Sequence, residues 1–182
     1  MATESSAESL ASLGAQAFAA GDYAQALTRF KAAAEAFTAT GDVLMAARMA
    51  NNMSVALLKQ GKPDEALAAS LGTEDVFANA GDIALQAMAL GNQASALSEL
   101  KRFEEALAAF RQAAALFKEA RQPDYEATIL QNMSTLQLRM KQPLIAMGTM
   151  AQALDIKPHL SIGEKLLRGL LSLVVRLMGG KV

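Results

Sequence analysis

The stretch that decides the fold is Ala50-Asn51-Asn52-Met53-Ser54, because the chain contains two later counterparts of it. Asn92-Gln93-Ala94 stands 40 residues further on, and Asn132-Met133-Ser134 stands another 40 residues beyond. A fixed period of this length is typical of proteins built from stacked helical repeats. Such solenoids mostly bind other molecules along a concave surface. The sequence therefore predicts a repeat protein whose task is binding.

Other positions repeat with the same interval. One column contains only alanine and comprises Ala26, Ala66, Ala106 and Ala146. A second column marks the start of a helix and comprises Tyr23, Pro63, Phe103 and Pro143. Proline is tolerated in the first turn of a helix, where its missing N–H costs little. Each period thus divides into two helices, and the alanine column predicts a close crossing between them.

The composition favours an all-α chain. Hydrophobic residues make up 52% of the sequence and aromatic residues only 5%, so that Ala, Leu and Met, which favour helices, dominate the apolar content. The net charge is −1, and we expect no nucleic-acid partner. The N-terminus lacks the basic and apolar regions of a signal peptide, and no apolar run is long enough to span a bilayer. We expect a cytoplasmic protein.

Catalysis is not expected from this set of residues. The chain has no Cys and one His, His159, which follows Pro158. Disulfides, thiolate nucleophiles and a His-based catalytic triad are therefore excluded, and His159 is expected to be a solvated loop residue. Paired acids such as Glu104-Glu105 suit the positive end of a helix. We predict no catalytic residues, no metal site and no cofactor.

The helical patterns are punctuated by pairs such as Gly41-Asp42, in which Asp42 is well placed to cap the following helix. Apolar spacing predicts helices over 6–19 and 23–38, 43–60 and 63–79, 82–99 and 103–120, and 125–140 and 143–156. The loops within these pairs are short, so each pair must be an antiparallel hairpin. The four predicted repeats are 6–38, 43–79, 82–120 and 124–157.

Small and large residues occupy separate columns in these repeats. The small ones fill the columns Gly14, Ser54, Ala94, Ser134 and Ala33, Thr73, Ala113, Ala153. This arrangement resembles the tetratricopeptide repeat. The longer period, with Ala50-Asn51-Asn52-Met53-Ser54, is similar to the Leu-Asn-Asn-Leu-Ala of the extended class found in kinesin light chains. The resemblance implies a right-handed α-solenoid that acts as a non-catalytic scaffold or adaptor between proteins.

The second repeat departs from the pattern. Gln93, which follows it, occupies a column otherwise held by large apolar residues. Ser70 and Thr73 stand where the first repeat has an aromatic ring and an alanine, and Gly72 lies between them inside the expected helix 63–79. Glycine within a helix costs about 1 kcal/mol relative to alanine. We expect this helix to be the weakest of the stack. Sequence drift is the simpler interpretation, and a bend or a soft spot is the alternative.

In the architecture that the chain resembles, the first helix of each pair lines the concave groove. Its free face then presents Arg48, Asn51, Asn52, Val55 and Lys59, followed by Met88, Asn92, Ser95 and Glu99, and by Thr128, Gln131, Asn132, Thr135 and Arg139. From this face we predict the peptide-binding residues Arg48, Asn51, Asn52, Lys59, Asn92, Gln131, Asn132 and Arg139. The resemblance implies that the Asn column grips the backbone of an extended segment from a protein or peptide partner, since a carboxamide both donates and accepts hydrogen bonds.

Two interpretations of the Asn column stay open. The column binds a partner, or it bonds neighbouring helices and sets the stacking of the repeats, and both roles can coexist. The groove faces of the first and third repeats lack Lys and Arg, so a clamp for a terminal carboxylate is not expected. Transient peptide binding and a place in a stable complex fit the sequence equally.

The repeat ends at Lys157-Pro158, and residues 160–178 predict an amphipathic helix. Residues 160–182 contain four basic side chains, Lys165, Arg168, Arg176 and Lys181, and the single acid Glu164. A cap on the last repeat is the simplest interpretation, since solenoids usually end with one. A basic amphipathic helix also suits an anionic membrane surface, self-association or a partner's groove. Its length and its arginines argue against spanning a bilayer.

Overall fold

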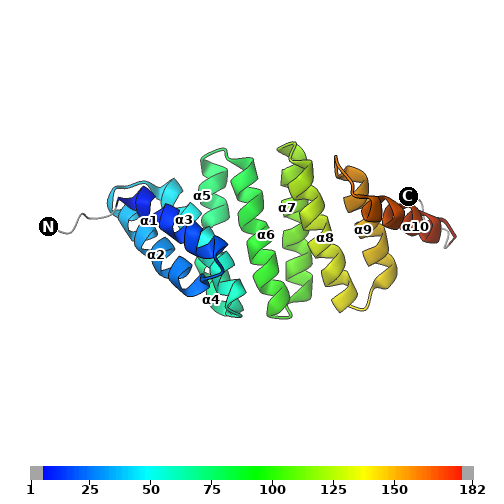
Figure 1. The fold of residues 1–182 in the computed structure, drawn as a ribbon, viewed down its shortest axis with the longest axis horizontal. Coiled ribbons are helices and arrows are strands. Elements are labelled where there is room, and N and C mark those ends of the chain that lie inside the picture. Colours follow the sequence, from blue (N-terminus) through cyan, green and yellow to red (C-terminus); the bar gives the residue numbers. More distant parts are fainter. Residues whose placement is uncertain (1–5, 178–182) are drawn as a thin grey trace.

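The computed structural model describes residues 6–177, the side chains of Val175 and Arg176 excepted. The helices are α1 (Ala7–Ala19), α2 (Tyr23–Ala39), α3 (Val43–Lys59), α4 (Pro63–Ser70), α5 (Thr73–Asn79), α6 (Ile83–Glu99), α7 (Phe103–Glu119), α8 (Pro123–Arg139), α9 (Pro143–Ile156) and α10 (Ile162–Leu177). They stack side by side in chain order, as Figure 1 shows. The predicted all-α solenoid with a C-terminal capping helix is confirmed. Met178 and Lys181 of the predicted C-terminal segment lie outside the described residues.

The turns between helices place one residue in the left-handed region of backbone space. Gly41 does so with a φ of 78°, which glycine tolerates because it has no Cβ. The following residue caps the next helix, since Oδ1 of Asp42 accepts the N–H of Met45 at 3.0 Å. The predicted cap at Asp42 is therefore confirmed. Gly81 and Arg121 hold the same left-handed position between the later repeats, with φ of 73° and 54°.

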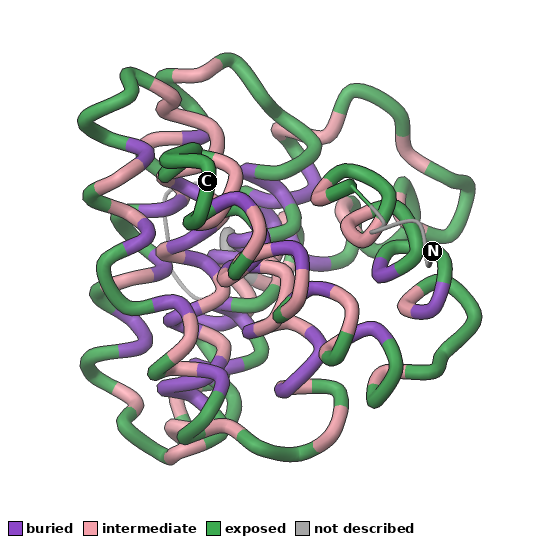
Figure 2. The backbone as a smooth tube through the Cα atoms, turned by 90° about the vertical axis from the view of Figure 1, so that its left-hand side faces the viewer, coloured by how far each residue is buried: buried purple, intermediate pink, exposed green. Residues whose placement is uncertain are grey.

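The alanine column forms close crossings within the helix pairs. Ala26, Ala66 and Ala106 are fully buried, and Ala146 is 1% exposed. Gly14 permits a similar approach from α1, because a Cβ at this position would lie 2.6 Å from Cδ1 of Phe30. Buried residues lie where the helices face one another, and exposed residues follow the outside of the stack (Figure 2). The core of the described residues is thus divided into clusters that lie between neighbouring helices.

The predicted continuous helix over 63–79 is wrong, because the chain leaves the helix between α4 and α5. Leu71 is extended, with a ψ of 130°, and Gly72 is left-handed, with a φ of 82°. The hydroxyl of Thr73 then donates to the carbonyl oxygen of Ser70 at 2.7 Å. The departures in this repeat therefore build a bend, which was the alternative to sequence drift.

Gln93 of α6 reaches into this break from the neighbouring repeat. Its Nε2 donates to the carbonyl oxygen of Ser70 at 2.9 Å and to a carboxylate oxygen of Glu74 at 2.5 Å. A buried carbonyl needs a hydrogen-bond partner, and the Ser70 oxygen has lost the amide that a continuous helix would supply. The polar residue in an apolar column thus compensates for the break.

The C-terminal helix α10 packs against α9. Leu171 is 7% exposed and shares an apolar cluster with Ala151 and Leu154 of α9. Arg168 also approaches α9, where its Nε lies 3.9 Å from Oδ1 of Asp155. These contacts cover part of the flank that the last repeat would otherwise expose.

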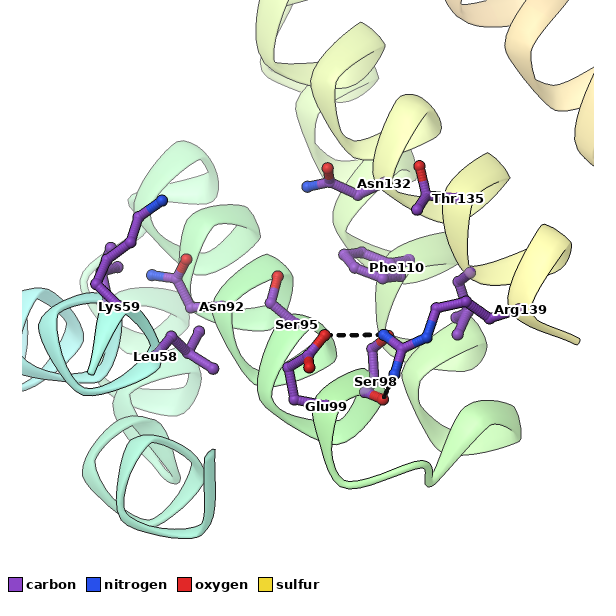
Figure 3. Close-up of a pocket in the computed structure, with 12 residues that line it drawn as sticks. Leu58, Lys59, Asn92, Ser95, Ser98, Glu99, Phe110, Asn132, Thr135 and Arg139 are labelled. Carbon is purple, nitrogen blue, oxygen red and sulfur yellow. Dashed lines mark hydrogen bonds and ion pairs between the residues drawn. The ribbon is translucent and has the colours of Figure 1, made fainter. Parts of the chain in front are cut away.

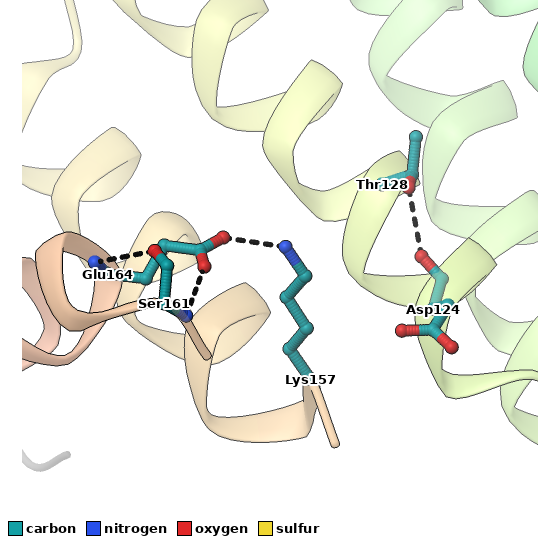
Figure 4. A network of polar contacts seen from close by, with 5 residues as sticks. All are labelled: Asp124, Thr128, Lys157, Ser161 and Glu164. Carbon is teal, nitrogen blue, oxygen red and sulfur yellow. Dashed lines mark hydrogen bonds and ion pairs between the residues drawn. The ribbon is translucent and has the colours of Figure 1, made fainter. Parts of the chain in front are cut away.

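The segment that connects α9 to α10 is held by the carboxylate of Glu164 (Figure 4). This carboxylate accepts hydrogen bonds from Nζ of Lys157 at 2.6 Å and from the N–H of Ser161 at 2.8 Å. The bond from Lys157, followed by those from Ser161, lowers the pKa of Glu164 to about 2. The ionised Glu164 therefore stabilises the folded chain fully at a pH above 4.5, the ordinary pKa of a glutamate. This stabilisation is lost as the pH falls through about 2, the pKa in the folded chain.

Replacing Gln93 by Leu should lower the free energy of unfolding by about 1–3 kcal/mol, although large apolar residues hold this column in the other repeats. The leucine cannot donate, so the Ser70 carbonyl and the Glu74 carboxylate each lose one hydrogen bond. Urea unfolding followed by circular dichroism measures the change. Met133→Leu is the matched control in the same column, where an apolar exchange should cost less than about 1.5 kcal/mol. A loss no larger than that of the control would show that the bonds of Gln93 do not stabilise the break.

Candidate functional site

The candidate site is a hollow that runs across repeats two to four, with a volume of about 420 Å³. It is lined by Val55, Leu58, Lys59, Asn92, Ser95, Ser98, Glu99, Phe110, Asn132, Thr135, Leu136 and Arg139. Most of these residues come from the first helices of the pairs, α3, α6 and α8, and Phe110 comes from α7. Figure 3 shows their side chains around one space. The hollow brings together four of the predicted site residues, Lys59, Asn92, Asn132 and Arg139.

Asn92 takes part both in the stacking of repeats and in the wall of the hollow. Its Nδ2 donates to Oδ1 of Asn51 at 2.8 Å. Asn51 is 4% exposed, so it lies beneath the groove surface and not on it as expected. The pair therefore joins α3 to α6, because two amides that face each other across a stack satisfy one another. The carbonyl oxygen and the second N–H of the Asn92 side chain remain for the groove.

Asn132 is the exposed member of the column. Its side chain stands over the hollow without a bond to any of the residues drawn in Figure 3. All of its hydrogen-bonding groups can therefore serve a bound molecule. Asn92 therefore contributes to the stacking of the repeats as well as to the groove wall, whereas Asn132 faces the groove alone.

Asn52 lines a second, smaller hollow at the N-terminal end of the groove. Its volume is about 200 Å³, and the other lining residues are Ala15, Phe18, Phe30 and Val55. Except for the amide of Asn52, the side chains around this hollow are entirely carbon. Val55 lines both hollows, so the two adjoin at this side chain.

The four predicted cations and amides at the edges of the groove have different surroundings. Arg139 is held within the protein: its Nη1 lies 2.8 Å from a carboxylate oxygen of Glu99 and 2.8 Å from Oγ of Ser98. Lys59 lines the hollow with its side chain exposed and forms no ion pair within residues 6–177. Arg48 and Gln131 line neither hollow.

The guanidinium of Arg139 also caps the end of α6. Its Nη2 donates to the carbonyl oxygen of Ser98 at 3.0 Å, and its carbon lies 5.3 Å from the centre of the Phe103 ring. Cations near the last carbonyls of a helix interact favourably with its negative end. Arg139 therefore fixes α8 against the end of α6, and this use of its charge leaves Lys59 as the free cation among the described lining residues.

Phe18, Phe30, Leu58, Ser98 and Phe110 line the hollows but were absent from the predicted groove face. Phe30 and Phe110 belong to second helices, whose rings reach between two first helices. The signal in the sequence was the aromatic residue that stands at the same position of the second helices, at Phe30 and Phe110. Within the described residues, no group of three or more His, Asp or Glu side chains could hold a metal ion.

Comparisons with known proteins bear on the fold. Residues 5–70 and 85–159 match the model of one protein family, described as the tetratricopeptide repeat. The apo form of RapI is similar over 94% of this chain and 53% of its own, with a TM-score of 0.73 and 14% sequence identity. BtubC (BKLC) from P. vanneervenii is similar over 93% of this chain and 72% of its own, with a TM-score of 0.68 and 16% identity. Identities this low show the fold alone, and this chain spans about half of RapI. No curated protein sequence matches the chain.

Replacing Asn92 or Asn132 by Ala should show which of the two side chains stabilises the stacking of the repeats. Asn92→Ala leaves the buried amide of Asn51 without its partner and should lower the free energy of unfolding by about 1–3 kcal/mol. Asn132→Ala removes no bond of this kind and should change it by less than about 0.5 kcal/mol. Urea titration of the two variants beside the unmodified chain gives both values. A loss of about 1–3 kcal/mol in both variants would show that the whole column is structural, and a loss below about 0.5 kcal/mol in both would show that the Asn92–Asn51 bond does not stabilise the stack.

Proposed function

Because the chain belongs to the tetratricopeptide repeat family, whose model matches more than half of it, we propose that it is a non-catalytic scaffold that binds an extended segment of a partner protein in the groove. The observation that carries this proposal is the hollow of about 420 Å³ that Asn92, Asn132 and Lys59 surround. Amide and ammonium groups that face solvent in a hollow are available to a ligand.

The amide column suits the backbone of the partner more than its side chains. A carboxamide can accept from a peptide N–H and donate to a peptide carbonyl at the same time. Stacked helices lie about 8–10 Å apart, and an extended chain advances about 3.3 Å per residue. Asn52, Asn92 and Asn132 would therefore meet the backbone at intervals of about three residues.

Lys59 adds a preference for an acidic side chain in the partner. Its ammonium stands free beside Asn92, whereas the charge of Glu99 is offset by Arg139 at 2.8 Å. Opposite charges across an interface raise the rate of encounter and disfavour wrong partners. The charge is modest, so the backbone contacts supply most of the grip.

Affinity capture from a native lysate tests the groove. The double variant Asn132→Ala/Lys59→Ala should recover at least about tenfold less of the partners held by the unmodified chain, equivalent to about 1.4 kcal/mol. Asn79→Ala/Lys31→Ala is the matched control, because it removes the same two kinds of exposed side chain from the outer helices. Equal recovery by both variants, with unchanged thermal melts, would exclude the groove as the binding surface.

A second function is favoured by the exposed face of α10, which suits attachment of the scaffold to an anionic membrane surface. Ile162, Leu166 and Leu177 are 80%, 71% and 78% exposed, and Leu170 and Leu173 continue the same face. A cap needs a polar outer surface, whereas this one is apolar. No helix in residues 6–177 is long and apolar enough to cross a bilayer.

Charge favours a membrane surface over pairing of two α10 helices. Lys165 is exposed beside the apolar face, and the acid of this helix, Glu164, is bonded to Lys157. Anionic lipid headgroups would neutralise the ammonium of Lys165, whereas the acid that a second α10 would bring, Glu164, is already bonded to Lys157. The outer face of α9 adds Leu144 and Ile145, each 55% exposed, to the apolar surface at this end.

Flotation with vesicles of phosphatidylserine and phosphatidylcholine tests this second function. The unmodified chain should float with the vesicles, less so as salt increases, and Leu166→Gln/Leu170→Gln should remain at the bottom. Leu71→Gln/Leu138→Gln is the matched control, since these leucines are 61% and 55% exposed away from α10. Absence of flotation by the unmodified chain would reject membrane attachment. A concentration-dependent dimer that only the α10 variant loses would assign the face to self-association.

A further inference from the structure

We infer that the groove is a series of three subsites, related by the repeat, whose polarity rises along the stack, so that it selects a partner segment with an apolar residue at one end and a hydrogen-bond donor at the other. This inference rests on the proposed binding of an extended segment and specifies its chemistry. The observation that carries it is the register of the two hollows on the repeat.

The smaller hollow defines the first subsite, formed by Ala15, Phe18, Phe30, Asn52 and Val55. Adding the period of 40 residues gives Val55, Leu58, Ser70, Asn92 and Ser95, and adding it again gives Ser95, Ser98, Phe110, Asn132 and Thr135. The larger hollow is lined by all of these except Ser70. It is therefore the second and third subsites joined together.

The loss of an aromatic ring explains why the second and third subsites merge. Phe30 and Phe110 form the base of the first and third subsites, but Ser70 occupies this position in the second. Ser70 is fully buried, and its hydroxyl lies 3.2 Å from the carbonyl oxygens of Ala66 and Leu67. The break that follows Ser70 thus leaves the middle of the groove without a ring to divide it.

The walls of the first and third subsites differ in chemistry. Carbon surrounds the first subsite, where Phe18 and Val55 flank the space beside Asn52. In the third, the hydroxyls of Ser95 and Thr135 donate to the carbonyl oxygens of Gly91 and Gln131, at 2.9 Å and 3.1 Å.

Because those protons are used within the helices, the oxygens of Ser95 and Thr135 remain as acceptors. Oγ of Ser98 already accepts from Arg139 at 2.8 Å. The third subsite therefore favours a side chain that donates, such as Ser, Thr, Asn or Gln, and disfavours an aliphatic one, which would cover those acceptors without bonding them.

The partner segment that fits has three features in order. An aliphatic or Met side chain enters the first subsite, and an acidic side chain passes the free ammonium of Lys59. A donating side chain then reaches the third subsite. The two outer subsites are two repeats apart, on the order of 20 Å, which an extended chain covers in about six residues.

Disulfide tethering tests the subsites with small probes in place of the partner, because the chain has no Cys that would compete. Asn52→Cys and Asn132→Cys each introduce one thiol, at the first and third subsites. Two symmetric disulfides compete for it: cysteamine acylated with 4-methylpentanoic acid, which ends like leucine, and cysteamine acylated with N-acetylserine. The protein thiolate attacks one sulfur of the probe and releases the other half as a thiol, and excess free thiol keeps the exchange at equilibrium.

Mass spectrometry of the intact chain gives the ratio of leucine-like to serine-like adduct. Gln25→Cys, exposed on α2, supplies the reference ratio. At Cys-substituted position 52 the ratio should exceed the reference about tenfold, which corresponds to burial of roughly two methylene groups. At position 132 it should fall to the reference or below. Equal ratios at the two positions would overturn the inference.

Two further variants show whether the walls set the preference. Val55→Ser introduces into the first subsite the residue type of Ser95 and should return its ratio to the reference. Ser95→Val should raise the ratio at position 132. If a thiol at position 52 or 132 alters the thermal melt, Ala15→Cys and Thr135→Cys address the same subsites. Adduct ratios that change with neither Val55→Ser nor Ser95→Val would also overturn the inference.

The outcome separates this inference from the proposed function. Ratios that differ as expected, together with lysate capture that is indifferent to the groove, would support the graded subsites and reject the proposed binding. Capture that depends on the groove, together with equal ratios, would support binding and reject the graded subsites.

Discussion

The structure depends on how closely the two helices of a pair can approach. Ala26, Ala66 and Ala106 are fully buried, and a larger side chain in this column would push the helix axes apart. In a solenoid each repeat contacts only its neighbours, so no distant contact can correct a poor crossing. The same crossing places the second helix behind the first, which allows rings such as Phe30 and Phe110 to reach the groove. Packing within a pair therefore determines the depth of the groove.

The second repeat shows how this constraint can be met without a regular helix. Gly72 breaks the outer helix, but Ala66 before the break remains buried, and Phe77 after it is fully buried as well. The Ser70 carbonyl that loses its helical amide at the break is bonded by the hydroxyl of Thr73 and by Gln93 of the next repeat. A defect that would weaken an isolated hairpin is thus repaired by its neighbour. Its consequence reaches the groove, since the residue before the break is the serine that leaves the middle subsite open.

The fold could be predicted from the sequence because the same pattern of small and apolar residues recurs in each repeat. Helix boundaries, the cap at Asp42 and the alanine crossings required only local chemistry and the repeat. The break at Gly72 did not follow, although Ser70, Thr73 and Gln93 were all visible as departures. Gln93 is remote from the break in sequence, and only the stacked structure shows that its amide meets the Ser70 carbonyl. The departures at Ser70 and at Gln93 lie in different repeats but form the two sides of one contact.

The candidate site was less predictable than the fold because a groove position does not fix what a side chain bonds. Asn52, Asn92 and Asn132 share one register, but the side chain of Asn92 donates one hydrogen bond to Asn51 in the preceding repeat. Arg139 lines the groove as expected of a site residue, but Glu99 and Ser98 already engage its guanidinium. In a repeat protein the neighbouring repeat competes with the partner for each polar group. The groups left over by this competition, Asn132 and Lys59 above all, are the ones that a partner can bind without first breaking a bond of the stack.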